Sequence, residues 1–208
     1  ETQHQELLLR LGEQYSEVEE MRFDMVGPVI GSEMRTKAIW AIVAALALIL
    51  AYIAWAFRKV SKPIASWKYG LLTIVAAMHD LIIPIGVFAV LGYFLGYQID
   101  TAFVAALLTI LGYSINDSIV VFDRTRENLT QAESESFSSI VNKSVNQTLT
   151  RSVNTSVTTL LVLLAVFFFG GDTVRHFALA LIVGVISGTY SSIFLASPLL
   201  VAWEKMKK

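Results

Sequence analysis

One aspartate, Asp117, stands inside a strongly apolar part of the chain. It follows the run "AFVAALLTIL" at 102–111 and belongs to the stretch "GYSINDSIVVFDRTREN". An aspartate at the centre of a membrane helix costs about 2.5–3.5 kcal/mol on insertion scales, so it is expected to face protein or water and to serve a function. The sequence therefore marks Asp117 as the first candidate for a functional site.

Arg151 is the natural partner for this carboxylate, because it is the single arginine that enters the next apolar stretch. A buried aspartate and an arginine on neighbouring spans predict a functional pair, with a purely structural salt bridge as the alternative. Polar residues at helical spacing accompany both, and we expect them to form a supporting polar face: Tyr113, Asn116, Thr155, Thr158 and Thr159. The threonines also fit ordinary helix packing, which membrane bundles commonly achieve with hydroxyl groups.

A second polar pair, His79 and Asp80, lies near the middle of another apolar stretch, one turn before Pro84. Two interpretations remain open for it. The two side chains can satisfy each other and fix the packing of helices, or they can take a direct part in ion movement.

The composition shows what kind of protein must position these residues. The chain has 208 residues, 55% of them hydrophobic and 16% charged, and its mean hydropathy is +0.61, which is typical of a membrane protein. A formal charge of −1 provides no basic surface for nucleic acid. The chain has no cysteine and its three histidines are scattered, so we expect neither a metal site nor a cofactor.

Five stretches are close to the length of about 20 residues that crosses a bilayer. Each is expected to be a helix, because an isolated segment in lipid must satisfy its own backbone groups. The predicted spans are 38–57, 69–93, 101–122, 152–169 and 177–203. Small residues in the last span, among them Gly184 and Gly188, favour close helix packing.

Lysine and arginine residues are concentrated on one side of these spans, which predicts that this side is cytoplasmic. The side includes the loop at 58–68, the segment at 124–151 and the C-terminal tail, whereas the opposite connections contribute only Arg175. Arg35 and Lys37 count against this orientation, but the bias still places the C-terminus in the cytoplasm.

Two further segments are expected outside the spans. Residues 1–35 are predicted to be the remnant of an α/β exterior domain, with a helix in "QELLLRLGEQ", a strand in "VEEMRFDMV" and a turn in "VGPVIGSEM". Residues 129–150 are predicted to form an amphipathic helix along the cytoplasmic surface. An outward N-terminus without an initiating methionine leads us to expect an earlier span and more of the exterior domain upstream.

Several blocks, in this order, resemble the SecF family, the smaller half of the bacterial SecDF membrane component of protein export. They are "VGPVIGSEM", the "HD" at 79–80, "LLTILGYSINDSIVVFDRTREN", "SVNQTLTRSVNTSVTTLLV" and "FFGGDTVRHFALALIVGVISGTYSSIFLASPLL". The resemblance implies an all-α polytopic membrane protein: one half of a helical bundle of the RND superfamily, with the first of six spans missing.

The resemblance also implies a function. With SecD, as a separate or fused chain, the protein would use the proton motive force to assist movement of unfolded exported polypeptide across the bacterial cytoplasmic membrane. SecYEG and SecA would be functional partners, with YajC and YidC as further candidates. Asp117 would carry the proton, and approach and withdrawal of Arg151 would switch it between charge states.

Other function classes stay open beside this interpretation. Nucleotide-binding motifs are absent from the sequence, so we expect no ATPase and no other enzyme. An RND-type half that exports lipid or drugs is one alternative, and the "SIND" and "GTYSS" blocks argue against it. A non-transporting scaffold that stabilises the translocon is the other.

Overall fold

The computed structural model describes Leu11 and residues 28–58, 65–132 and 135–206. The chain divides into two units, residues 1–36 and residues 37–208. The helix and strand expected before residue 27 lie outside the described residues, apart from Leu11, so the remnant of an exterior domain stays a prediction.

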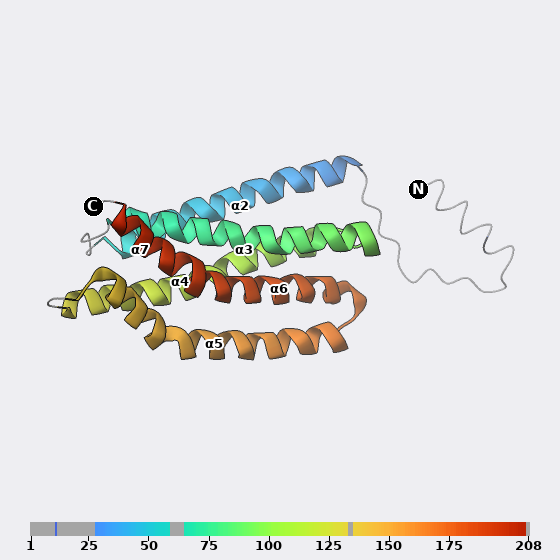
Figure 1. Ribbon diagram of the computed structural model, residues 1–208. Helices are drawn as coiled ribbons and strands as arrows, with labels where there is room; N and C mark the ends of the chain where they lie inside the picture. Colours follow the sequence, from blue (N-terminus) through green and yellow to red (C-terminus); the bar gives the residue numbers. More distant parts are fainter. Residues whose placement is uncertain (1–10, 12–27, 59–64, 133–134, 207–208) are drawn as a thin grey trace. The chain divides into compact units, whose positions relative to one another are not determined.

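The described residues 37–206 form an all-helical bundle (Figure 1). Five of its helical segments are long and apolar enough to cross a membrane, which confirms the predicted helical membrane fold. The elements are α2 (Pro28–Ala56), α3 (Ser66–Leu95), α4 (Thr101–Gln131), α5 (Phe137–Phe169), α6 (Asp172–Ser191), η1 (Ser192–Ala196) and α7 (Ser197–Lys205).

Local sequence signals account for several helix ends. Gly96 takes a left-handed conformation, with φ of 71°, and terminates α3. The Asp100 side chain accepts a hydrogen bond of 2.8 Å from the Phe103 backbone N–H and so caps the start of α4. Ser136 caps α5 in the same way, through the backbone N–H of Ser139. These short connections make α3, α4, α5 and α6 successive antiparallel neighbours.

Three helices differ from their predicted extents. The stretch "VGPVIGSEM" was expected to turn, but α2 begins at Pro28 within it, because proline is well suited to the first position of a helix. The predicted surface helix at 129–150 is not a separate element, since α4 continues to Gln131 and α5 begins at Phe137. The 33 residues of α5 span about 50 Å at 1.5 Å per residue, so this helix extends well beyond a hydrocarbon core of about 30 Å.

The last span changes its helical form near its middle. Between α6 and α7, the five residues of η1 form a π-helical turn. Pro198, just after this turn, has no N–H to donate and its ring excludes the carbonyl four residues earlier, which favours a wider turn. The Ser197 hydroxyl donates to the Ser192 carbonyl, five residues back, and satisfies one of the freed acceptors. The π turn sets the direction of Ser192.

Candidate functional site

Asp117 lies in the interior of the bundle, where α4, α5 and the α6–η1 junction meet. Its side chain accepts a hydrogen bond of 2.8 Å from Ser152 Oγ at Oδ1 and one of 3.1 Å from Ser192 Oγ at Oδ2. The residue is only 8% exposed. An ionised carboxylate has about four acceptor positions, so the described residues fill half of them. The carboxylate is buried, held by two helices, and still open to a further donor or a proton.

Arg151 does not contact Asp117 in the structure. Its side chain is exposed and lines a cleft of about 490 Å³ between α4 and α5, together with Asp123, Arg124 and Glu127. Within the described part of the chain, the Arg151 guanidinium has neither a hydrogen bond nor an ion pair. Its neighbour Ser152 faces Asp117 instead, so the structure leaves the predicted pairing of arginine and aspartate as a proposal.

The expected polar face is split between the interior and the surface. The Tyr113 hydroxyl donates to Ser156 Oγ over 3.2 Å, and Ser156 Oγ lies 2.5 Å from Thr189 Oγ1, so Tyr113 belongs to a network between α4, α5 and α6. Asn116 is exposed. The three threonine hydroxyls donate to backbone carbonyls of their own helix, those of Arg151, Asn154 and Thr155. Serines, rather than the predicted threonines, form the face of α5 that meets α4.

Asp80 has a much fuller set of partners than Asp117. It is fully buried, and its carboxylate accepts from the hydroxyls of Ser114, Ser187 (2.8 Å) and Ser191 (2.5 Å). His79 Nδ1 lies 2.9 Å from Oδ1 and completes four hydrogen bonds when that nitrogen carries the proton. The partners come from α3, α4 and α6. The predicted pair is therefore not self-contained, because three serines join it.

Close packing of α6 against α4 brings these serines to the two carboxylates. A methyl group added at Gly184 would lie 2.3 Å from side-chain atoms of Ile110, and one added at Gly188 would lie 3.0 Å from Ser114 Cβ. Such contacts are possible only for glycine, which confirms the expected small-residue packing in the last span. Ser187 and Ser191 lie near these glycines on α6 and so reach the interior.

The sequence argument missed most of the hydroxyls that hold the carboxylates. Ser114, Ser152, Ser187 and Ser192 were not singled out, and Ser191 was noted only as a small packing residue. A signal for some of them was present. Ser114 lies one turn before Asp117, and Ser152 and Ser156 share a face through their spacing of four residues, which places hydroxyls beside a carboxylate in the span.

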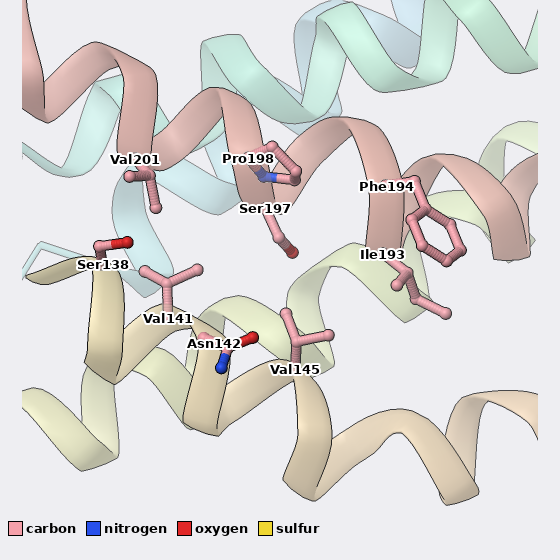
Figure 2. Close-up of a pocket in the computed structure, with 9 residues that line it drawn as sticks. All are labelled: Ser138, Val141, Asn142, Val145, Ile193, Phe194, Ser197, Pro198 and Val201. Carbon is pink, nitrogen blue, oxygen red and sulfur yellow. The ribbon is translucent and has the colours of Figure 1, made fainter.

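Two other features were considered as sites. No group of three or more His, Cys, Asp or Glu residues in the described part of the chain is arranged to hold a metal ion. Figure 2 shows a groove of about 370 Å³ between the first turns of α5 and the η1–α7 segment. The side chains that line it are mostly apolar, from Val141 and Val145 to Phe194 and Val201, and none of them is titratable. The groove therefore lies apart from the carboxylate chemistry.

Comparisons with known proteins agree with this arrangement. Residues 8–206 match the family model described as "Protein export membrane protein SecD/SecF, C-terminal". The chain is 54% identical over 194 residues to "Protein translocase subunit SecF" of Thermobaculum terrenum, covering 93% of this chain and 60% of the relative. It is 48% identical over 185 residues to "Protein translocase subunit SecDF" of Thermus thermophilus, covering 89% of this chain and 24% of the relative.

A solved structure shares the fold as well. The "Crystal structure of SecDF in Super-membrane-facing form" has a TM-score of 0.77 and 40% sequence identity, over 97% of this chain and 26% of that chain. The chain spans about 60% of the length of the SecF relative from Thermobaculum terrenum. The helical membrane bundle, the family match and the SecF relatives agree, and the chain belongs to the SecD/SecF family of protein export membrane proteins, where it corresponds to SecF.

Proposed function

We propose that this chain is the membrane part of a SecF subunit that, with SecD, uses the proton motive force to assist polypeptide translocation across the bacterial cytoplasmic membrane. The printed names of its relatives describe protein translocase subunits, which supports the coarser role in protein translocation. The same names give no support for an enzyme. Lipid or drug export, or a purely stabilising role, are the competing functions.

The observation that carries the proposal is the state of the Asp117 carboxylate. It is buried within a membrane-spanning helix, yet only two described donors, Ser152 and Ser192, occupy its acceptor positions. A carboxylate with unused acceptor positions can bind a proton or receive a cationic donor without first losing its existing partners. Such a group is suited to carry a proton through a membrane protein.

Arg151 is the proposed switch for this carboxylate. It precedes Ser152 on α5, and successive side chains on an α-helix point about 100° apart. A rotation of α5 about its axis would therefore replace the Ser152 hydroxyl by the Arg151 guanidinium at Asp117. Approach of the cation favours the ionised carboxylate and its withdrawal favours the protonated form, which gives a cycle of proton release and uptake.

A SecD partner is supported by polar side chains on the outer surface of the membrane helices. Asn116 on α4 and Arg151, Asn154, Thr155 and Thr158 on α5 are all exposed in the described chain. Polar and charged groups in a span normally face protein or water rather than lipid. A complementary polar half, such as SecD, would cover them, and the relative from Thermus thermophilus is named SecDF. SecYEG, SecA, YajC, YidC and the exported polypeptide stay proposed partners by family resemblance.

The proposed orientation places the C-terminus in the cytoplasm. Lys68 lies 5.7 Å from the ring centroid of Trp67 and 5.2 Å from that of Trp203, so the start of α3 and the end of α7 share one end of the bundle. Tryptophan and lysine at this level are typical of a membrane–water interface, and basic residues mark the cytoplasmic side. Labelling of a cysteine placed at Lys205 in right-side-out vesicles by a membrane-impermeant reagent would reverse the orientation.

The test of function is Asp117→Asn in the full-length protein together with SecD. The substitution keeps the size of the side chain but removes its proton, so stimulation of export by a proton gradient is expected to be lost. Asp123→Asn is the matched control, because Asp123 lies on the same helix but its side chain is 68% exposed. Export is measured in inverted membrane vesicles with and without the gradient, at equal levels of SecD association.

The outcomes separate the competing functions. Full stimulation by the gradient in Asp117→Asn vesicles would support the scaffold role and reject proton transport through Asp117. Normal gradient-driven export in vesicles that lack the subunit, together with lost efflux of lipid or drug, would favour the exporter role. Loss of stimulation in both aspartate variants would show that the assay does not respond to the buried carboxylate in particular.

A further inference from the structure

Asp80 is saturated with hydrogen-bond donors. Both of its carboxylate oxygens have two partners: His79 Nδ1 and Ser187 at Oδ1, and Ser114 and Ser191 at Oδ2. An ionised carboxylate offers about four acceptor positions, so no position is left for a proton unless one of these partners leaves. This arrangement is suited to holding helices in place, and it differs in this respect from Asp117.

The Asp80 cluster connects directly to the partners of Asp117. Ser191 donates to Asp80, and the next residue, Ser192, donates to Asp117. On α4, Ser114 donates to Asp80 and lies one helical turn before Asp117. Both elements that bring donors to Asp80 from outside α3 therefore also define the surroundings of Asp117.

The packing leaves little freedom in this connection. Gly188 lies one turn before Ser192, and a methyl group there would come within 3.2 Å of the Ser114 Cα atom. The α6 backbone is thus pressed against α4 at the level of the Asp80 cluster. A rotation or shift of α6 that moved Ser191 away from Asp80 would also move Ser192 relative to Asp117.

We propose that Asp80 is a positioning residue for Asp117: it stays ionised, and through Ser114 and Ser191 it fixes α6 against α4 so that Ser192 can hold the proton-carrying carboxylate. The inference rests on the proposed function of Asp117. It also resolves the two open interpretations of His79 and Asp80 in favour of a structural anchor that serves the transport site.

The first test is a spectroscopic signature of Asp117. In infrared difference spectra of the full-length SecF–SecD complex at low and high pH, the carboxyl band that Asp117→Asn removes is assigned to Asp117. Ser114→Ala and Ser191→Ala are expected to shift this band, because they release α6 from Asp80. Ser118→Ala is the matched control. It removes a fully buried hydroxyl one turn from Ser114 whose oxygen has no hydrogen-bond partner in the described chain.

The result of Asp80→Asn separates a positioning residue from a second proton carrier. The inference expects the Asp117 band to shift and no other carboxyl band to disappear. Disappearance of a second titrating band in Asp80→Asn would show that Asp80 itself carries a proton, and would overturn the inference. An Asp117 band that is unchanged in both serine variants would overturn it as well.

A second measurement is independent of proton transport. In a double-mutant cycle, the effects of Ser114→Ala and Asp117→Asn on the unfolding equilibrium constant are expected to deviate from additivity by about threefold or more. Ser118→Ala and Asp117→Asn should combine additively. If the wild-type spectrum contains no Asp117 band, the proposed function fails, and this cycle alone decides the positioning role. Additive effects for Ser114→Ala would then reject that role.

Discussion

Asp80 and Asp117 are buried aspartates on neighbouring spans of one bundle, but their surroundings differ in one decisive respect. Asp80 is fully buried and has four partners on three helices, whereas Asp117 is 8% exposed and has two. Burial alone therefore does not identify a transport group. The number of acceptor positions left open distinguishes a carboxylate that can change its charge from one that holds the structure.

The surroundings of the two residues extend this contrast. Asp80 lies where α3, α4 and α6 meet, and its partners, apart from the partly exposed His79, are fully buried or nearly so. Asp117 lies one residue away from exposed polar positions on both α4 and α5, next to Asn116 and opposite the helix that carries Arg151. The anchored carboxylate is remote from the outer polar surface, and the open one lies beside it.

The largest expected effect is on stability, from removal of the Asp80 carboxyl group. Asp80→Ala leaves four donors without an acceptor, so we expect a loss of at least about 3 kcal/mol in the free energy of unfolding. Asp117→Ala removes two hydrogen bonds and is expected to cost roughly 1 kcal/mol, since such bonds average about 0.6 kcal/mol in membrane proteins. Titration of the purified protein with SDS measures both values. Equal losses in the two variants would remove the contrast.

A smaller effect is expected from separating α6 and α4, which serve both carboxylates. Gly184→Ala places a methyl group against Ile110, so repacking should cost about 1–3 kcal/mol of unfolding free energy. Gly86→Ala is the control, because a methyl group there meets nothing within 4 Å and alanine favours a helix. SDS titration of both variants tests this prediction. No loss in Gly184→Ala would mean that the helices can move apart freely.

A third prediction compares two hydroxyls on successive faces of α5. Ser152→Ala removes a donor to Asp117 and is expected to cost about 0.6 kcal/mol of unfolding free energy. Thr155→Ser keeps a hydroxyl that can donate to the Arg151 carbonyl of its own helix and should have almost no effect on export. Gradient-stimulated export, measured beside stability, should fall only in Ser152→Ala. A larger export defect in Thr155→Ser would place the functional face of α5 on the threonines.

The smallest effect on stability is expected for Arg151. Its guanidinium has no described hydrogen bond or ion pair, so Arg151→Lys should change the free energy of unfolding by less than about 0.5 kcal/mol. Gradient-stimulated export should nevertheless be impaired, because lysine lacks the planar group that binds a carboxylate through two hydrogen bonds. Export and unfolding are measured on the same preparation. A clear loss of stability with normal export would make Arg151 a structural residue.

Several features of the protein follow from its sequence alone. The apolar runs predicted five membrane helices, since a segment in lipid has few other ways to satisfy its backbone, and five such helices are present. Asp117, His79 and Asp80 stood out because polar groups in a span are costly. The small residues of the last span predicted close packing, and Gly184 and Gly188 indeed lie against α4.

Only the tertiary structure decided which groups face one another. A serine or threonine in a helix can donate to the carbonyl four residues earlier, as Thr155 does, or to another helix, as Ser152 does, and the sequence does not distinguish these choices. The outcome depends on the rotation of each helix about its axis, which the contacts at Gly184 and Gly188 constrain for α6. For that reason the sequence identified both carboxylates, whereas the fold determined that one is saturated by serines and the other remains open.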